Sequence, residues 1–241
     1  MIKREVKNEY LSDDIWKGNP IYRKEGIIMG TFKNADGKPV LLKMVKAIQE
    51  NKAYLGEVDG LIGDGDHGMN MNKGFSIFGT RFQDKSFTFS EGLNELGTIL
   101  FNEIGGSMGP IYGTILMDMG EAGKNLDEIH LKDFMNMLEA GLNGLCEIVE
   151  AKVGDKTLVD TLSPAVDSLK ESVAADLDFA QALGKMKVSA QEGRDSTKDM
   201  VAKFGRSSRL GERSRGVLDA GAASCYIILD AMAEGIISIL K

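Results

Sequence analysis

Apolar residues recur three and four positions apart along almost the whole chain after residue 38, a spacing that places them on one face of a helix. No convincing alternating strand pattern follows residue 40, and the chain contains only four prolines. The sequence therefore predicts an all-α fold of about eight amphipathic helices. We expect them near residues 39–58, 69–82, 90–104, 109–122, 131–150, 158–174, 179–203 and 217–240.

The first 37 residues mix charges, glycines and aromatic residues without a clear period. We expect an N-terminal extension over residues 1–37, with a short strand or hairpin ending at the turn Asn34–Gly37. Neither a repeat nor a low-complexity linker divides the rest of the sequence. A single domain over residues 38–241 is therefore predicted.

Charge and composition narrow the classes of partner. A net charge of −7 argues against nucleic acid or an anionic membrane as the main partner. The sequence has neither an apolar run of membrane-spanning length nor the apolar segment of a signal peptide, so a cytoplasmic location is expected. Cys146 and Cys225 lie in apolar helical patterns and are expected to be reduced core residues.

An acidic stretch, Asp59–Phe75, brings Asp59, Asp64 and Asp66 together among glycines. Three carboxylates this close repel one another, so a positive group should lie among them. Mg²⁺ and Ca²⁺ prefer carboxylate oxygens, which favours a metal site on a loop. A dinucleotide fingerprint would follow a strand, and an EF-hand would need other residues at key positions. An acidic loop with Asp66 or Asn70 capping the next helix remains the alternative.

Two more segments suit phosphate binding. A glycine-rich turn between two predicted helices carries Ser107, although it could equally be a tight interhelical turn. The arginine loop, Gly205–Gly216, holds four arginines, whose guanidinium groups fit phosphate oxygens. Val153–Asp160 is explained as a helix start, with Thr157 as the cap. Carboxylates for Mg²⁺, a Gly-Ser turn and the arginine loop together indicate a nucleotide's phosphates and phosphoryl transfer.

Several short motifs then follow one another in a fixed order. They are GDGDHG at 63–68 with Asn70, GGSMGPIYG at 105–113, GDKT at 154–157, GR at 205–206, LGERS at 210–214 and DAG at 219–221. In this order and spacing the chain closely resembles the L subunit of dihydroxyacetone kinase (DhaL), over about residues 38–241. The resemblance implies a barrel of eight antiparallel amphipathic helices.

The resemblance also implies the roles of particular residues. Asp59, Asp64 and Asp66 would hold two Mg²⁺ ions that bridge the phosphates of ADP or ATP. The nucleotide would contact His67, Gly68, Met69, Asn70, Ser107, Met108, Leu158, Arg206, Asp219, Ala220 and Gly221. One departure is Met108, where the family usually has a serine, so a hydroxyl donor is lost there or supplied by Ser107. No residue of this chain is assigned as a general base or other catalytic group.

In the family that the chain resembles, a separate K subunit binds dihydroxyacetone, and the L subunit presents the phosphoryl group to it. The resemblance implies a phosphotransferase subunit with Mg–ADP/ATP as bound coenzyme, recharged by a phosphohistidine-bearing M protein of the phosphotransferase system. A homodimer is a further possibility. The alternatives are an ATP-dependent kinase subunit for another small ketose, and a nucleotide-sensing partner of a transcription regulator.

Overall fold

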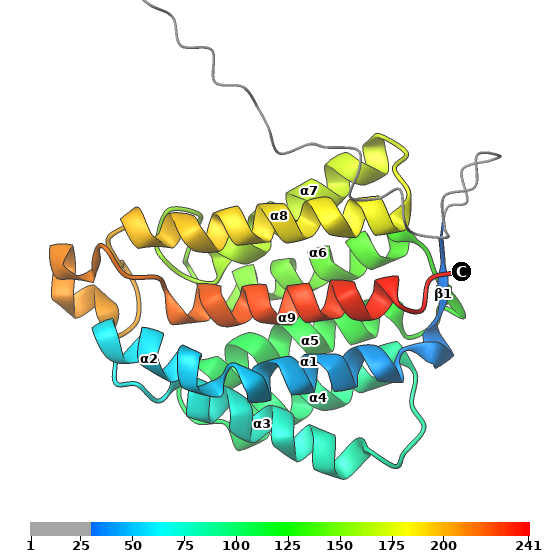
Figure 1. The fold of residues 1–241 in the computed structure, drawn as a ribbon, viewed down its shortest axis with the longest axis horizontal. Coiled ribbons are helices and arrows are strands. Elements are labelled where there is room, and N and C mark those ends of the chain that lie inside the picture. Colours follow the sequence, from blue (N-terminus) through cyan, green and yellow to red (C-terminus); the bar gives the residue numbers. More distant parts are fainter. Residues whose placement is uncertain (1–29) are drawn as a thin grey trace, which may run out of the picture.

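The computed structural model describes residues 30–241 and contains nine α-helices within that range (Figure 1). A closed ring is formed by eight of them, α1 and α3 to α9, in which each helix packs against its two neighbours and α9 returns to contact α1. Consecutive ring helices run in opposite directions, so the fold is the antiparallel helical barrel that the family resemblance implied. The helices are α1 (Lys38–Glu50), α2 (Lys52–Ile62), α3 (His67–Phe82), α4 (Phe89–Glu103), α5 (Met108–Gly123), α6 (Leu131–Ile148), α7 (Val159–Ala174), α8 (Phe179–Ser196) and α9 (Ala220–Ile237).

The predicted helix over residues 39–58 is divided in the structure. Asn51 interrupts it, and both its backbone N–H and its side-chain amide donate to the carbonyl of Ala47. Such a side-chain bond competes with helix continuation. The remaining piece, α2, leaves the ring and packs on α3 and α9 at one end of the barrel. This break explains why the structure has one helix more than the pattern predicted.

Side-chain caps set where several helices begin. Thr88 and Glu91 form a reciprocal capping box at the start of α4, and Asp178 caps α8 by accepting the N–H of Gln181. His130 has the same kind of structural role, since it forms a capping box with Asp133 at the start of α6.

The end of α8 and the segment that follows it differ from the prediction. Helix α8 ends at Ser196 rather than near residue 203, and the hydroxyl of Thr197 donates to the carbonyl of Arg194 at this end. A segment of 3-10 turns and loop then leads to α9. The segment between α8 and α9 is therefore longer than expected, and it contains the whole arginine loop.

A short strand precedes the barrel, as predicted, but its partner is distant in sequence. Strand β1 (Phe32–Lys33) pairs antiparallel with β2 (Glu128–Ile129), so that Phe32 faces Ile129 across the pair. The side-chain amide of Asn34 donates to the carbonyls of Gly123 and Leu126. Phe32 and Asn34 are thus buried in the helical body, although they precede the domain boundary predicted at residue 38. That boundary stays a prediction.

Aromatic rings fill the end of the barrel beside β1. Phe32 is fully buried and meets Phe89 edge to face, with ring centroids 5.4 Å apart. It also contacts Phe179, which lies against Phe134 at a centroid distance of 5.8 Å. Burial of these rings and the aromatic pair geometry stabilise this end as a closed apolar layer.

Helix α9 is the one described helix with the length and hydropathy of a membrane span, and 67% of that stretch is buried in the protein as part of the ring. Cys225, on α9, is buried as expected, but the prediction that Cys146 is a core residue was wrong. Cys146 follows the buried Leu145 on α6 and falls on the exposed face of that helix.

We predict that Phe32→Ala lowers the free energy of unfolding by roughly 3–5 kcal/mol, because it leaves a cavity between two rings. Urea denaturation followed by circular dichroism measures the loss. The neighbouring exposed residue supplies a matched control, since Lys33→Ala should change stability by less than about 0.5 kcal/mol. Equal effects of the two substitutions would show that β1 contributes little to the packed core.

Candidate functional site

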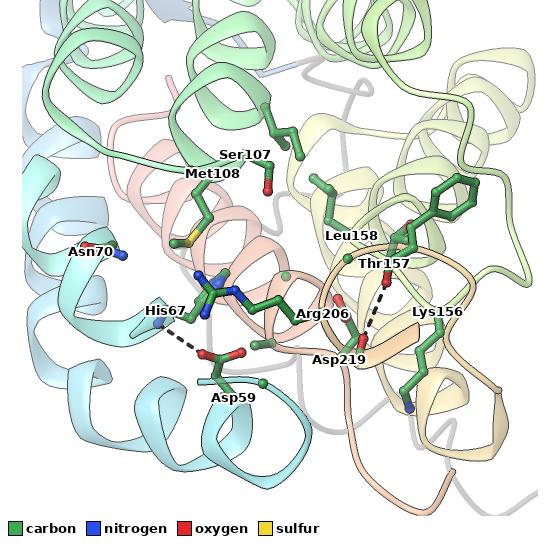
Figure 2. Close-up of a pocket in the computed structure, with 18 of the residues that line it drawn as sticks. Asp59, His67, Asn70, Ser107, Met108, Lys156, Thr157, Leu158, Arg206 and Asp219 are labelled. Atoms are coloured by element: carbon green, nitrogen blue, oxygen red, sulfur yellow. Dashed lines mark hydrogen bonds between the residues drawn. The ribbon is translucent and has the colours of Figure 1, made fainter. Parts of the chain in front are cut away.

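A cavity of about 610 Å³ opens at the end of the barrel opposite β1 (Figure 2). Its walls come from the α2–α3 loop, the α4–α5 turn, the α6–α7 connection, the arginine loop and the start of α9. The size falls in the range typical of small-molecule sites. Segments that are far apart in the sequence therefore meet in one place, and they include most of the predicted site residues.

The three aspartates of the acidic stretch meet at the cavity. Asp59 lies in the last turn of α2, and Asp64 and Asp66 lie in the loop that follows. One oxygen from each carboxylate can be chosen so that all three lie within 4.8 Å of one another. An all-carboxylate donor set of this span fits a hard divalent cation such as Mg²⁺ or Ca²⁺.

Glycines make this close approach possible. Gly65 has a φ of +77°, a left-handed conformation that favours glycine. A Cβ atom at Gly63 would lie 2.3 Å from the Oδ1 atom of Asp59, so any side chain there would push the carboxylate away. The sequence of the loop is thus adapted to hold carboxylates together.

Helix α3 begins at the loop and directs two of its first four residues into the cavity. His67 and Asn70 line it, and the backbone N–H of His67 donates to Asp59 Oδ2 at 3.3 Å. Gly68 is instead buried against α2, where a Cβ would come within 2.1 Å of the carbonyl oxygen of Lys52. Met69 is 60% exposed and lies outside the cavity. The structure therefore does not place Gly68 or Met69 among the lining residues.

A buried hydrogen-bond chain holds the His67 ring. Its Nε2 atom lies 2.7 Å from the Ser224 hydroxyl, which lies 2.6 Å from the hydroxyl of Tyr112. Tyr112 in turn donates to the carbonyl of Gly221 at 2.9 Å. Burial lowers the pKa of His67 to about 4, although the nearby charge of Asp59 acts in the opposite direction. His67 is therefore a neutral, fixed wall residue near pH 7.

The glycine-rich turn forms another wall. Gly106 has a φ of +73°, and Ser107 stands at the N-cap of α5 without a side-chain capping bond. Its hydroxyl is thus not committed to closing the helix. Met108, the departure from the family pattern, lines the cavity and packs against the apolar core. This wall combines the start of a helix, which favours anions, with one apolar side chain.

An apolar wall lies on the far side of the cavity. Leu158 precedes α7 and is nearly buried. Val149, Ala151 and Val159 also face the cavity from the α6–α7 connection and the start of α7. An apolar wall opposite a cluster of charges suits a ligand with a flat apolar part and an anionic part.

Arg206 is the one arginine of the arginine loop that lines the cavity. It forms an ion pair with Asp64, which joins the arginine loop to the acidic stretch across the cavity mouth. Figure 2 shows its guanidinium group close to His67 and Asp59. Arg209 and Arg213 lie outside the lining, and Arg215 binds Glu212. Of the four arginines, the one that lines the cavity is thus the one that the family resemblance named.

Asp219, Ala220 and Gly221 line the cavity at the start of α9, as predicted. Asp219 is the N-cap of this helix, and its Oδ2 atom accepts the N–H of Ala222 at 2.8 Å. Burial raises the pKa of Asp219 to about 6, and the positive charge of Lys156 partly opposes this shift. The residue thus has a structural role in fixing the helix end that borders the cavity.

Several residues that were not predicted from the sequence also line the cavity, among them Tyr112, Lys156, Thr157 and Phe204. Each of these four residues stands inside or next to a motif described above, but that motif was explained as a turn or a helix start. Their proximity depends on helices packing side by side, and no local pattern contains that information.

Comparison with known proteins places these features in a family. A model of the DAK2 domain matches residues 61–234. The ADP-binding subunit DhaL of PEP-dependent dihydroxyacetone kinase 1 from Listeria innocua is 35% identical over 188 residues, which cover 78% of this chain and 89% of that protein. The corresponding ADP-binding subunit DhaL from Escherichia coli K12 is 36% identical over 183 residues, covering 75% of this chain and 86% of that protein.

A solved structure supports the same fold. The dihydroxyacetone kinase of C. freundii, in complex with AMP-PNP and Mg²⁺, superposes with a TM-score of 0.64 at 18% sequence identity. The match covers 97% of this chain and 38% of that longer chain. The helical barrel, the matched domain and the identity to proteins of similar length agree with one another, and the chain therefore belongs to the DAK2 domain family.

Proposed function

We propose that this chain is the nucleotide-binding, phosphoryl-donating subunit of a dihydroxyacetone kinase, a phosphotransferase with an alcohol group as acceptor. The observation that carries the proposal is the arrangement of charge around one cavity. Three carboxylates and Arg206 lie on one side of it, and the apolar wall around Leu158 lies on the other. A nucleoside diphosphate or triphosphate fits this arrangement, because its base matches the apolar wall and its charged phosphates match the side with the metal-binding carboxylates and Arg206.

Asp59, Asp64 and Asp66 would hold Mg²⁺, two ions according to the family resemblance. When bound, Mg²⁺ neutralises charge on the phosphates and lowers the barrier to transfer of the terminal group. Arg206 is placed to add positive charge at the same position from the arginine loop. The chain's residues thus act by positioning and charge neutralisation, and no general base is assigned among them.

The acceptor would be presented by a second subunit. The Listeria innocua and Escherichia coli proteins are ADP-binding subunits of PEP-dependent kinases, and this chain aligns over most of their length. We therefore propose a dihydroxyacetone-binding K subunit as partner, and a phosphohistidine-bearing M protein that recharges bound ADP in the cytoplasm. The ATP-dependent alternative differs in using free ATP in place of a retained nucleotide.

Whether the purified protein retains a nucleotide distinguishes the subunit recharged by an M protein from the ATP-dependent kinase. We expect mass spectrometry of the extensively dialysed protein to detect about one equivalent of ADP, released when Mg²⁺ is chelated. Reversible binding of added ATP by an initially empty protein would instead support the ATP-dependent kinase. A protein that binds neither nucleotide, with or without Mg²⁺, would contradict the proposed function.

Asp64→Asn should reduce phosphoryl transfer to dihydroxyacetone by roughly a hundredfold or more, because it removes a metal-binding charge at the reacting phosphates. The rate is measured with the K subunit and the phosphoryl donor present. The free energy of unfolding should change by less than about 0.5 kcal/mol, because Asp64 contributes only one surface ion pair.

A matched control is available on α2. Glu57→Gln removes another carboxylate from the same region, but Glu57 is exposed and does not line the cavity. Its transfer rate should equal that of the unmodified protein. If Asp64→Asn retained the full rate, or if both variants lost activity equally, the proposed metal-binding role of Asp64 would be wrong.

A further inference from the structure

Lys156 has a conformation and an environment that are unfavourable for a lysine. Its φ is +61°, one of two positive values at non-glycine residues in the described chain. Its side chain is also almost fully buried, with 1% exposure. Left-handed backbone and a buried charge both oppose folding unless the surrounding structure compensates for them. Lysine at this position therefore calls for a physical explanation.

The contacts of the Lys156 ammonium group supply this explanation. Its Nζ atom donates to the carbonyl of Thr197 at 2.6 Å and also to the carbonyl of Val217. These two carbonyls stand at the beginning and the end of the segment that joins α8 to α9. One charged group thus binds both ends of a segment of about twenty residues, and Arg206 lies between them.

Other hydrogen bonds join the same two ends of the segment between α8 and α9. The N–H of Gly216 donates to the carbonyl of Lys198 at 2.7 Å, and the N–H of Asp219 donates to the Thr197 hydroxyl at 3.0 Å. Burial lowers the pKa of Lys156, and the carboxylates of Asp219, Asp160 and Asp199 oppose this shift. The hydrogen bonds to two carbonyls thus hold the ammonium group where the two ends of the segment converge.

Asp155, which precedes Lys156, binds the same segment at a position nearer to Arg206. Asp155 accepts the backbone N–H of Lys203 at its carbonyl, at 3.2 Å, and forms an ion pair with the Lys203 ammonium. Lys203 stands three positions before Arg206. In Figure 2 the side chain of Lys156 points away from Arg206. Lys156 thus acts on the cavity through the segment between α8 and α9, and not by reaching toward a ligand itself.

We infer that Lys156 is a positioning residue that holds the segment between α8 and α9 closed, so that Arg206 stays at the cavity mouth and bound nucleotide is retained. This inference rests on the proposed function. It assigns to the GDKT motif a task different from its sequence-based explanation as a helix start. It also makes the dissociation rate of the nucleotide depend on a side chain that does not touch it.

The test compares nucleotide dissociation from the full-length protein and its variants, using a fluorescent ADP analogue with Mg²⁺. Lys156→Met removes the ammonium group, and we expect dissociation at least roughly tenfold faster, as for loss of a charge-assisted hydrogen bond. Lys156→Gly is the second variant. Glycine adopts φ +61° without strain, so this variant keeps the backbone suitable for folding if the methionine variant is not recovered.

Lys38→Met is the matched control. Lys38 also donates to two backbone carbonyls, those of Gln83 and Lys85, but in the α3–α4 connection away from the cavity. Its removal should leave the dissociation rate unchanged. A folded Lys156→Met or Lys156→Gly protein with an unchanged dissociation rate would overturn the inference.

A double-mutant comparison separates positioning from general loss of structure. In an Arg206→Ala background, Lys156→Met should accelerate dissociation by less than about threefold, because the side chain that it positions is already absent. A full tenfold acceleration in that background would mean that Lys156 acts by another route, and would overturn the inference.

Limited trypsin digestion provides a test that needs no nucleotide. Lys156→Met should be cut faster than the unmodified protein after Lys203 and within the arginine loop, and Lys38→Met should not. Equal cutting would overturn the inference. Failure of the unmodified protein to bind nucleotide would refute the proposed function instead, and the digestion would still decide whether Lys156 holds the segment closed.

Discussion

The mutual repulsion of three carboxylates is the interaction on which the open end of this barrel depends. Asp59, Asp64 and Asp66 are held within a span that suits one or two divalent cations. The glycines of the loop permit this approach, and α3 begins immediately after it. Arg206 supplies positive charge from the arginine loop by pairing with Asp64. A cation at the three carboxylates and the guanidinium group of Arg206 would therefore compete for the same oxygen atoms.

The two ends of the barrel differ in what holds them together. Around β1, phenylalanine rings pack into a closed apolar layer, and Asn34 satisfies buried backbone groups. At the cavity, an ion pair, a helix cap and buried hydrogen bonds join the loops beside the apolar wall around Leu158. The polar groups that a ligand would meet are thus held at one end of the ring of helices, and the other end is closed by packed rings.

The sequence predicted most of the fold because the apolar period of each ring helix is strong and local. It could not reveal the break at Asn51, because the period continues across that residue while a side-chain amide competes for the backbone. The pairing of β1 with β2 was also inaccessible, since each strand has two residues and the partners lie far apart in the sequence. The carboxylates were predictable from their spacing. Arg206 was named through the family resemblance, whereas the burial of Lys156 depends on how distant segments pack.

The backbone bonds between Thr31 and Lys241 have a practical consequence. Each donates its N–H to the carbonyl of the other, at 3.3 and 3.0 Å, on the side of the barrel that carries β1 (Figure 1). The first described residues and the last residue therefore lie side by side at the end remote from the cavity. A short linker could join these two positions, and new termini could be opened in an exposed connection elsewhere. Circularly permuted versions of this barrel are thus geometrically accessible, with the cavity mouth left clear for a partner.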